Sequence, residues 1–153
     1  MNISSQIAKQ LRAAYFGGNW TAVPVKDQLS NITWQQATTQ VHNLNTIVKL
    51  VYHLHYYIEA VTNVLEGEPL TAKDKYSFDH PPIQSQEDWE ALRDRSYKAV
   101  EKLAALIEQF PDDRLEEVFE KEQYGNYYRN FTGIIEHVHY HLGQIVLIRK
   151  ILG

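Results

Sequence analysis

The sequence predicts an all-α protein, namely a four-helix bundle with long connections. Apolar residues recur with a period near 3.6 in four separate stretches of the 153-residue chain, as they do in amphipathic helices. No strand pattern lies between these stretches. The polar segments that separate them exceed the short loops of a simple up-down-up-down bundle. Long connections allow crossovers, so other helix orders are open to this chain.

The first helix is predicted over residues 3–16. Its apolar residues lie at helical spacing (Ile3, Ile7, Leu11, Ala14 and Tyr15), and a Gly-Gly-Asn sequence ends it. The following segment, residues 20–31, contains Pro24 and scattered β-branched residues, so we expect an irregular connection. Thr33 and Gln36 then have the spacing of a capping box and predict a short helix.

The second long helix is predicted to begin after Asn45 or Thr46, because either side chain can cap a helix. It continues to about Glu66, where Gly67 ends it. Its apolar face has a period near 3.6 (Ile47, Leu50, Val51, Leu54, Ile58, Val61 and Leu65). A polar loop punctuated by prolines follows, and it is too long to be a tight turn.

The third and fourth long helices complete the predicted bundle. Ser85 caps the third, with Asp88 at its third position, and Pro111 marks its end. The charged and tyrosine-rich segment that follows is interpreted as a connection. We expect Thr132 to cap the last helix, which then continues to about Leu152.

The composition narrows the classes of function. We expect one domain over residues 1–153. A formal charge of −4 and the lack of a basic stripe argue against nucleic-acid binding. With no cysteine, any bound metal would have nitrogen and oxygen ligands. No apolar run approaches the ~20 residues of a membrane span, and the first residues do not resemble a signal peptide. A cytoplasmic protein is expected.

The stretch "HVHYHLGQI", residues 137–145, contains three alternating histidines. Alternation would suit a strand, but the segment lies within a longer run with helical spacing, so we predict a helix. On a helix, His137 and His141 lie one turn apart on one face, whereas His139 is rotated ~200° from His137. The pair shares its stripe with apolar residues and should face the bundle interior. This spacing can clamp a metal.

The second long helix offers another inward histidine. His53 in "LVYHLHYYI" lies at the inner edge of that helix, and His55 is expected on the outer side, ~200° away. Three imidazoles with room for water are the ligands of a catalytic site. Zinc, nickel, iron(II) or copper(II) would accept them, and spacing alone does not choose. The alternative is that these histidines are hydrogen-bonded core residues.

Other polar residues have smaller predicted roles. His42 and His80 are expected in solvent, because both lie in connections. The mouth of a site would be formed by "GGNW", residues 17–20, and by "YGNYYRN", residues 124–130, with Arg129 as an anion contact. We find no general base, because Glu59 is rotated ~240° from the second-helix histidine. A face of the last helix would suit a dimer (Ile135, His139, Leu142 and Val146).

The histidine motifs resemble those of the DinB-like (damage-inducible) superfamily of bacterial four-helix bundles. Its members carry one histidine midway along the second helix and HxxxH followed by Gly-Gln on the fourth. The matching residues here are His53, His137 and His141, with Gly143 and Gln144 after them. The segments "GGNW", "DQLSNITWQQA" and "FDHPPIQSQEDW" are also similar to one branch of the superfamily, so the resemblance covers most of the chain.

The resemblance implies an up-down-down-up bundle with nickel or zinc on His53, His137 and His141. It also implies a small-molecule substrate and a homodimer. Characterised members include transferases and isomerases that use bacillithiol, mycothiol or glutathione, and others are described as metal-dependent hydrolases. Three hypotheses follow. The protein is a metal-dependent thiol S-transferase or hydrolase, a metal-binding stress or binding protein without catalysis, or a structural bundle with core histidines.

Overall fold

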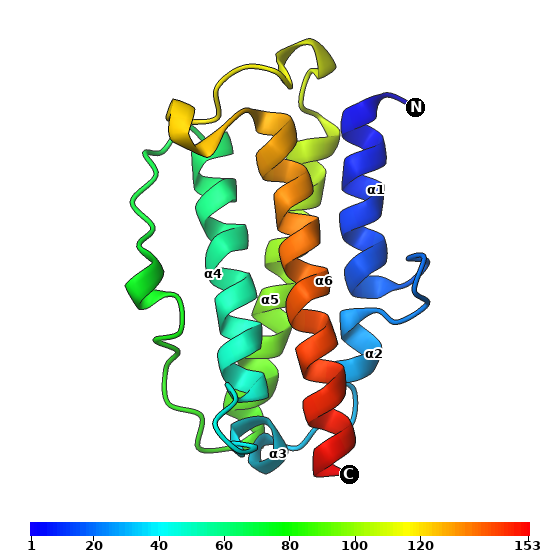
Figure 1. The fold of residues 1–153 in the computed structure, drawn as a ribbon, viewed down its shortest axis with the longest axis vertical. Helices are drawn as coiled ribbons and strands as arrows, with labels where there is room; N and C mark the ends of the chain where they lie inside the picture. Colours follow the sequence, from blue (N-terminus) through cyan, green and yellow to red (C-terminus); the bar gives the residue numbers. More distant parts are fainter.

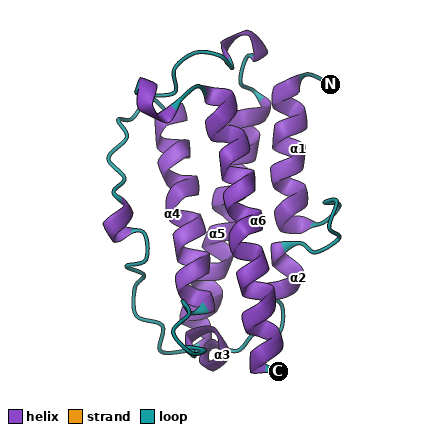
Figure 2. Cartoon of the chain, viewed as in Figure 1, coloured by secondary structure: helices purple, strands orange, loops and turns teal.

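The computed structural model describes all 153 residues and contains four long helices, with no strand (Figures 1 and 2). The long helices are α1 (Ile3–Phe16), α4 (Ile47–Leu65), α5 (Gln86–Glu108) and α6 (Tyr127–Leu152). The connections contain two short helices, α2 (Val25–Leu29) and α3 (Trp34–Thr38), and three single-turn 3-10 helices (Asp74–Tyr76, Asp112–Arg114 and Glu122–Tyr124). The predicted all-α class is confirmed.

The four long helices form a closed ring with the predicted up-down-down-up order. In Figure 1, α1 and α6 run downward, whereas α4 and α5 both run upward. α4 packs between α5 and α6, and α1 closes the ring by contacting the same two helices. Because α4 and α5 are parallel, residues 66–85 must return along the length of the bundle. This connection passes along the outside of α4 (Figure 1).

Helix starts follow the capping residues that the sequence identifies. Thr46 accepts a hydrogen bond from the backbone N–H of Lys49 at α4, and Ser85 accepts one from Asp88 at α5. At α3, Thr33 and Gln36 form the predicted capping box. Each side chain satisfies an N–H group that has no partner within its own helix. The predicted starts of these three helices are therefore confirmed.

Two predictions about helix boundaries were wrong. α6 begins at Tyr127 instead of after Thr132, because Asn126 caps it by accepting from the N–H of Arg129 at 2.8 Å. The Thr132 hydroxyl donates to the Tyr128 carbonyl inside the helix. The segment expected to be irregular contains α2, which Pro24 precedes. Proline is tolerated at a helix start because its missing N–H is not needed there.

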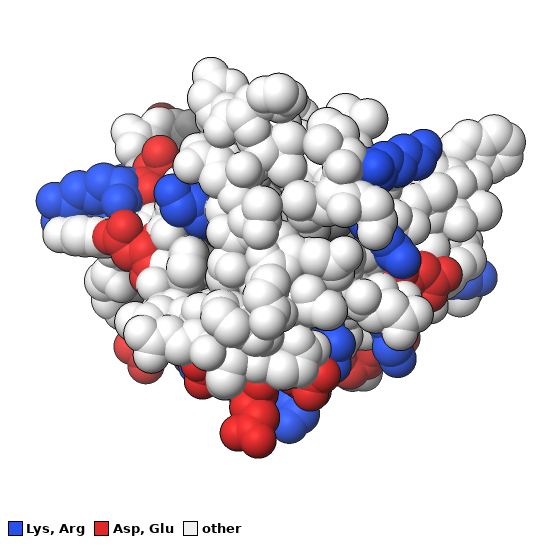
Figure 3. All heavy atoms as spheres, turned by 90° about the horizontal axis from the view of Figure 1, so that it is seen from below, with Lys and Arg blue, Asp and Glu red and all other residues white.

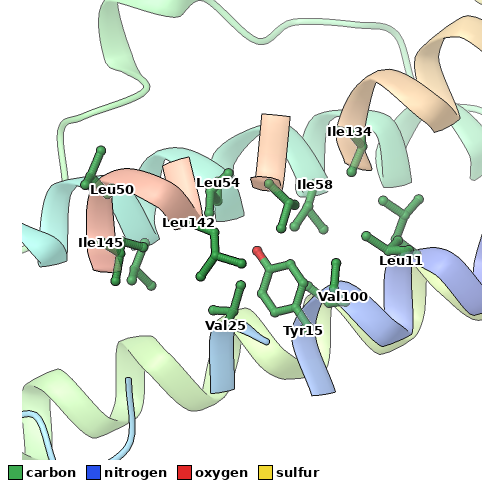
Figure 4. Close-up of a cluster of buried hydrophobic side chains, with 14 of the residues drawn as sticks. Leu11, Tyr15, Val25, Leu50, Leu54, Ile58, Val100, Ile134, Leu142 and Ile145 are labelled. Carbon is green, nitrogen blue, oxygen red and sulfur yellow. The ribbon is translucent and has the colours of Figure 1, made fainter. Parts of the chain in front are cut away.

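The core lies along the axis of the bundle, where all four long helices contribute apolar side chains (Figure 4). Leu11, Leu54 and Ile145 are almost completely buried there. Trp89 on α5 is completely buried, and its indole N–H donates to the carbonyl of Ile32 at 3.0 Å. This bond ties α5 to the segment before α3. The segment that carries the short helices is therefore attached to the bundle by this buried contact as well as by its covalent connections.

One end of the bundle has few charges. Figure 3 shows this end from below, with charged side chains around the edge and uncharged ones across the centre. The sequence has no Asp, Glu, Lys or Arg between Asp27 and Lys49, the part of the chain that contains α3.

No helix combines the length and the apolar character that a membrane crossing requires.

Candidate metal centre

Three histidine rings meet between α4 and α6. The Nε2 atom of His137 lies 3.0 Å from Nε2 of His53 and 3.0 Å from Nε2 of His141. The ligand atoms of all three rings lie within 4.8 Å of one another. These are the residues that the sequence selects as metal ligands, and the structure brings them together in one cluster. Their binding of a metal stays a prediction.

Helix geometry explains why these rings converge. His137 and His141 are four residues apart on α6, so their side chains stack one turn above the other. α4 packs against α6 and presents His53 to both rings, with ring centroids 4.8 Å apart in each case. His53 and His141 are 6% and 7% exposed, whereas His137 is half-buried. The cluster thus lies at the edge of the core, within reach of solvent.

A serine from the α4–α5 connection orients His53. Nδ1 of His53 lies 2.9 Å from Oγ of Ser77, which is completely buried. The Ser77 hydroxyl donates its own proton to the backbone carbonyl of Asp74 at 2.7 Å, so it accepts from His53 Nδ1–H. The neutral ring then has no proton on Nε2, and this lone pair points toward the other two histidines.

A glutamine on α6 orients His141 in the same way. Nδ1 of His141 lies 2.7 Å from the side-chain carbonyl oxygen of Gln144. An oxygen acceptor requires the imidazole proton on Nδ1, which leaves Nε2 as the lone-pair atom. The glutamine of the Gly-Gln pair in the sequence motif therefore has a physical role, because Gln144 fixes the tautomer of the histidine three residues before it.

Aromatic rings hold the His53 and His137 imidazoles in place. The ring of Phe78 stacks on His53, with centroids 4.1 Å apart and planes 2° from parallel. Tyr57 on α4 contacts both imidazoles edge-on, at 5.1 Å from His53 and 5.2 Å from His137. These contacts limit the rotation of the imidazoles and help to fix the directions of their Nε2 lone pairs.

Two tyrosines fasten the connection to α4 beside the histidines. The Tyr57 hydroxyl donates to the carboxylate of Asp74. The Tyr56 hydroxyl donates to the carbonyl of Lys73 at 2.9 Å and accepts from its N–H at 2.7 Å. Sequence reasoning treated this segment only as a loop and missed Asp74 and Ser77. No periodicity or motif marks them, because they reach the site only through the return path of the connection.

A cavity of about 620 Å³ opens beside the histidines. Its wall combines α4, the α4–α5 connection, the 3-10 turn before α6 and the first turns of α6 (His53, Tyr57, Val61, Asp74, Gln123, Tyr124, Arg129, Asn130, Thr132, Gly133, Ile134, Glu136 and His137). The predicted contribution of residues 124–130 is confirmed for Tyr124, Arg129 and Asn130, and the role of Arg129 as an anion contact stays a prediction. The predicted contribution of "GGNW" is wrong, because Gly18 and Trp20 line a separate hollow with α1.

Burial makes two of the rings poor bases. Burial lowers the pKa of His53, and the nearby charge of His141 lowers it further. Burial, followed by the charges of His141 and His53, lowers the pKa of His137 to about 4. Both rings are therefore neutral at pH 7, which is the form of imidazole that binds metals.

The donor set fits a divalent cation. Nitrogen ligands at about 2.0–2.1 Å from a tetrahedral ion lie ~3.3 Å apart. Two of the Nε2–Nε2 distances here are 3.0 Å, and the ligand atoms of the third pair, His53 and His141, lie within 4.8 Å of each other. Lone pairs held at that separation repel each other unless a proton or a cation lies between them. The Nε2 atoms of His53 and His141 both face Nε2 of His137, so the three residues could hold a metal ion.

The other histidines divide into exposed and packed residues. His42 is exposed, and His80 and His139 are half-buried. The prediction that His55 lies on the outer side of α4 was wrong, because α5 packs against that flank and leaves His55 only 1% exposed. Its Nε2 atom lies 3.1 Å from the carboxylate of Glu59. Accordingly, Glu59 does not line the cavity beside the three histidines.

The face of α6 that was expected to suit a dimer is largely packed within the bundle. Leu142 is only 3% exposed, and Ile135 and Val146 pack against the core. The large apolar residues that α6 does expose are Tyr128, Tyr140, Leu147 and Ile151. The homodimer itself stays a prediction.

Comparison with known proteins agrees with this architecture. Searches among curated proteins and among solved structures found no match. The profile of the DinB superfamily matches residues 8–145, which includes all three histidines of the cluster and the connections between them. The chain belongs to the DinB superfamily.

Proposed function

We propose that this protein is a metal-dependent enzyme acting on a small-molecule substrate, with one divalent ion, nickel or zinc, on His53, His137 and His141. The convergence of three Nε2 atoms beside a cavity of about 620 Å³ carries this proposal. Three protein ligands leave a coordination position for water or substrate, as in catalytic zinc sites. A structural site would instead be closed by a fourth residue.

The reaction that we propose is thiol-dependent transfer or hydrolysis. A bound ion would supply the acidification of a water molecule or the binding of a thiolate. The thiol must be a separate low-molecular-weight compound, because the chain has no cysteine. Ser77 and Gln144 keep the Nε2 lone pairs directed toward the common point, and the buried flank of α4 excludes water from the back of the site.

Asp74 is the residue best placed to accept a proton from a substrate in this cavity. Its carboxylate lines the wall next to His53 and already accepts the hydroxyl proton of Tyr57. Burial, together with the hydrogen bond to Asp74, raises the pKa of Tyr57 to about 12. Tyr57 therefore keeps its proton at neutral pH and holds Asp74 by donating to it. This carboxylate supplies the general base that sequence reasoning did not find.

The hydrogen-bonded core is the main alternative, since both Nε2–Nε2 distances are within hydrogen-bonding range. Nδ1 of His53 and His141 each donate, so those two neutral rings carry no proton on Nε2. One proton on Nε2 of His137 would have to serve both contacts, which weakens each bond. A cation satisfies all three lone pairs at once, and we therefore favour the metal site.

Metal analysis of protein purified without a polyhistidine tag tests the proposal. We expect about one nickel or zinc ion per chain, lost in His53→Ala and His137→Ala. His139→Ala is the matched control, because this half-buried histidine lies on the same helix outside the cluster. Equal metal content in all variants, or none in the wild type after incubation with either ion, would overturn the proposal.

A second experiment separates the enzyme from a non-catalytic metal-binding protein. The metal-loaded chain is assayed with bacillithiol, mycothiol and glutathione against electrophilic acceptors, and with an ester panel for hydrolysis. Turnover that disappears in Asp74→Asn while the metal stays bound supports catalysis with Asp74 as the base. Full metal occupancy without turnover on any of these substrates supports the binding protein.

A further inference from the structure

Arg129 is a cation without a partner on the wall of the cavity. Of the six arginines of the chain, four have side-chain partners: Arg12, Arg93 and Arg114 form ion pairs, and Arg149 donates to two carbonyls. The guanidinium of Arg129 makes no ion pair and no hydrogen bond, although it lines the same cavity as His53 and His137. Its five N–H donors are therefore free for a ligand.

The backbone makes room for this side chain. Gly125 has a φ of +79°, a conformation that other residues rarely adopt, and a Cβ atom built on it would lie 2.7 Å from Cδ of Arg129. The aliphatic part of Arg129 therefore lies against the backbone of Gly125. Any side chain at position 125 would displace Arg129 from this position. The glycine thus sets the path of the arginine as well as the turn.

Two asparagines fix the turn from which Arg129 projects. Asn126 accepts from the N–H of Arg129 at 2.8 Å. Asn130 donates through its side-chain amide to the carbonyls of Tyr124 at 2.9 Å and of Asn126 at 2.8 Å. Because both ends of the turn are held, the entropic cost of ordering Arg129 on a ligand is smaller than it is for an arginine on a loose loop.

The charges around the cavity select the kind of anion. Asp74 and Glu136 also line the wall, so one arginine is set against two carboxylates. A metal ion would balance the charge of a thiolate bound to it, but away from the ion a group with several negative charges would be repelled by the two carboxylates. A single carboxylate can form two parallel hydrogen bonds with the planar guanidinium. Gln123, Asn130 and Thr132 add amide and hydroxyl groups to the wall. These suit an uncharged polar part of the same molecule.

We propose that Arg129 binds the carboxylate of a small, singly charged substrate whose other end reaches the three histidines. The assignment of the reacting end depends on the function proposed above. The assignment of the carboxylate end depends only on the free guanidinium, on the space that Gly125 leaves for it and on the charges of the wall. Arg129 is accordingly a residue that determines specificity.

Mercapto acids test this proposal on cobalt(II)-loaded protein, in which thiolate binding gives a charge-transfer absorption. Mercaptoacetate, 3-mercaptopropionate and 4-mercaptobutyrate are each compared with the corresponding amide. We expect one acid to bind about tenfold more tightly than its amide, with an advantage that decreases as salt is added. In Arg129→Gln the ratio of acid affinity to amide affinity should fall to about one.

Arg95→Gln is the matched control. Arg95 is likewise without an ion pair or hydrogen bond, but it lies on α5 and does not line this cavity. It should leave the ratio of acid to amide binding unchanged. If Arg129→Gln also leaves the ratio unchanged, then the acid gains its affinity by chelating the cobalt, and the proposal is overturned. On metal-free protein, tighter binding of pyrophosphate than of a monocarboxylate would overturn the choice of a single carboxylate.

Titration of metal-free protein with butyrate separates this proposal from the metal site. Butyrate has one carboxylate and no thiol, so it reports only on the carboxylate contact through the chemical shift of the Arg129 Nε–H resonance. A saturable shift supports the role of Arg129 even if the protein fails to bind cobalt, in which case the proposed function alone fails. No shift on addition of butyrate, together with normal cobalt and thiol binding, rejects Arg129 and leaves the metal site standing.

Discussion

Acidification of the metal-free protein should destabilise it through His137. The pKa of His137 is about 4 in the folded chain, against an ordinary value of 6.5. The folded state therefore disfavours the protonated ring more strongly than the unfolded state does. The associated stability is fully present above pH 6.5, and it is lost as the pH falls toward 4. Burial of His53 acts in the same direction.

The size of this effect follows from the shift in the pKa of His137. One pKa unit corresponds to about 1.4 kcal/mol, so lowering the pKa from 6.5 to about 4 corresponds to about 3.5 kcal/mol at most. His137 is only half-buried and lines an open cavity, and water there screens part of the charge. We therefore expect His137 to cost about 1.5–2 kcal/mol of unfolding free energy between pH 7 and pH 4.

Urea denaturation in the presence of a chelator measures this quantity. The wild type and His137→Gln are unfolded at pH 7 and at pH 4, and the loss of unfolding free energy is compared between the two proteins. Carboxylates titrate in both, so their contribution cancels in the difference. The wild type should lose about 1.5–2 kcal/mol more than the variant. Equal losses would refute the conclusion that the folded chain holds His137 in its neutral form.

Two further substitutions test contacts away from the metal-binding atoms. Ser77→Ala removes the acceptor of His53 Nδ1–H and should weaken metal binding about tenfold or more, as measured by competition with a chromophoric chelator; unchanged affinity would contradict the orienting role. Trp89→Phe removes the buried donor to the Ile32 carbonyl and should lower the free energy of unfolding by about 1–3 kcal/mol. A loss below about 0.5 kcal/mol would contradict the stabilising role of this hydrogen bond.

Local signals made much of the fold predictable. Thr46 and Ser85 cap their helices with their own side chains, so a few neighbouring residues were enough to locate the starts of α4 and α5. The start of α6 was missed because Asn126 lies in a tyrosine-rich segment without an apolar period, while Thr132 looked like a cap. A threonine can also donate to a carbonyl of the preceding turn, as Thr132 does.

The site was predictable only for the part that helix periodicity determines. Spacing alone brought His137 and His141 onto one face, and the apolar stripe of α4 placed His53 inside. Helix periodicity gave the wrong burial for His55. It gives the angle between two residues on one helix, but not the number of other helices that pack around them. α4 has neighbours on two flanks. The contact of Ser77 with His53 could not be predicted for a related reason, since the position of Ser77 depends on the path of a long connection.

The path of residues 66–85 also limits how this site could be transferred to another protein. Copying the three imidazoles onto a bundle with short loops would reproduce the ring positions without the hydroxyl that fixes the His53 tautomer or the Phe78 ring that stacks on it. An engineer would have to transplant the crossing segment together with both helices. For the same reason, a protease cut in that segment would loosen the imidazole cluster while leaving every long helix intact.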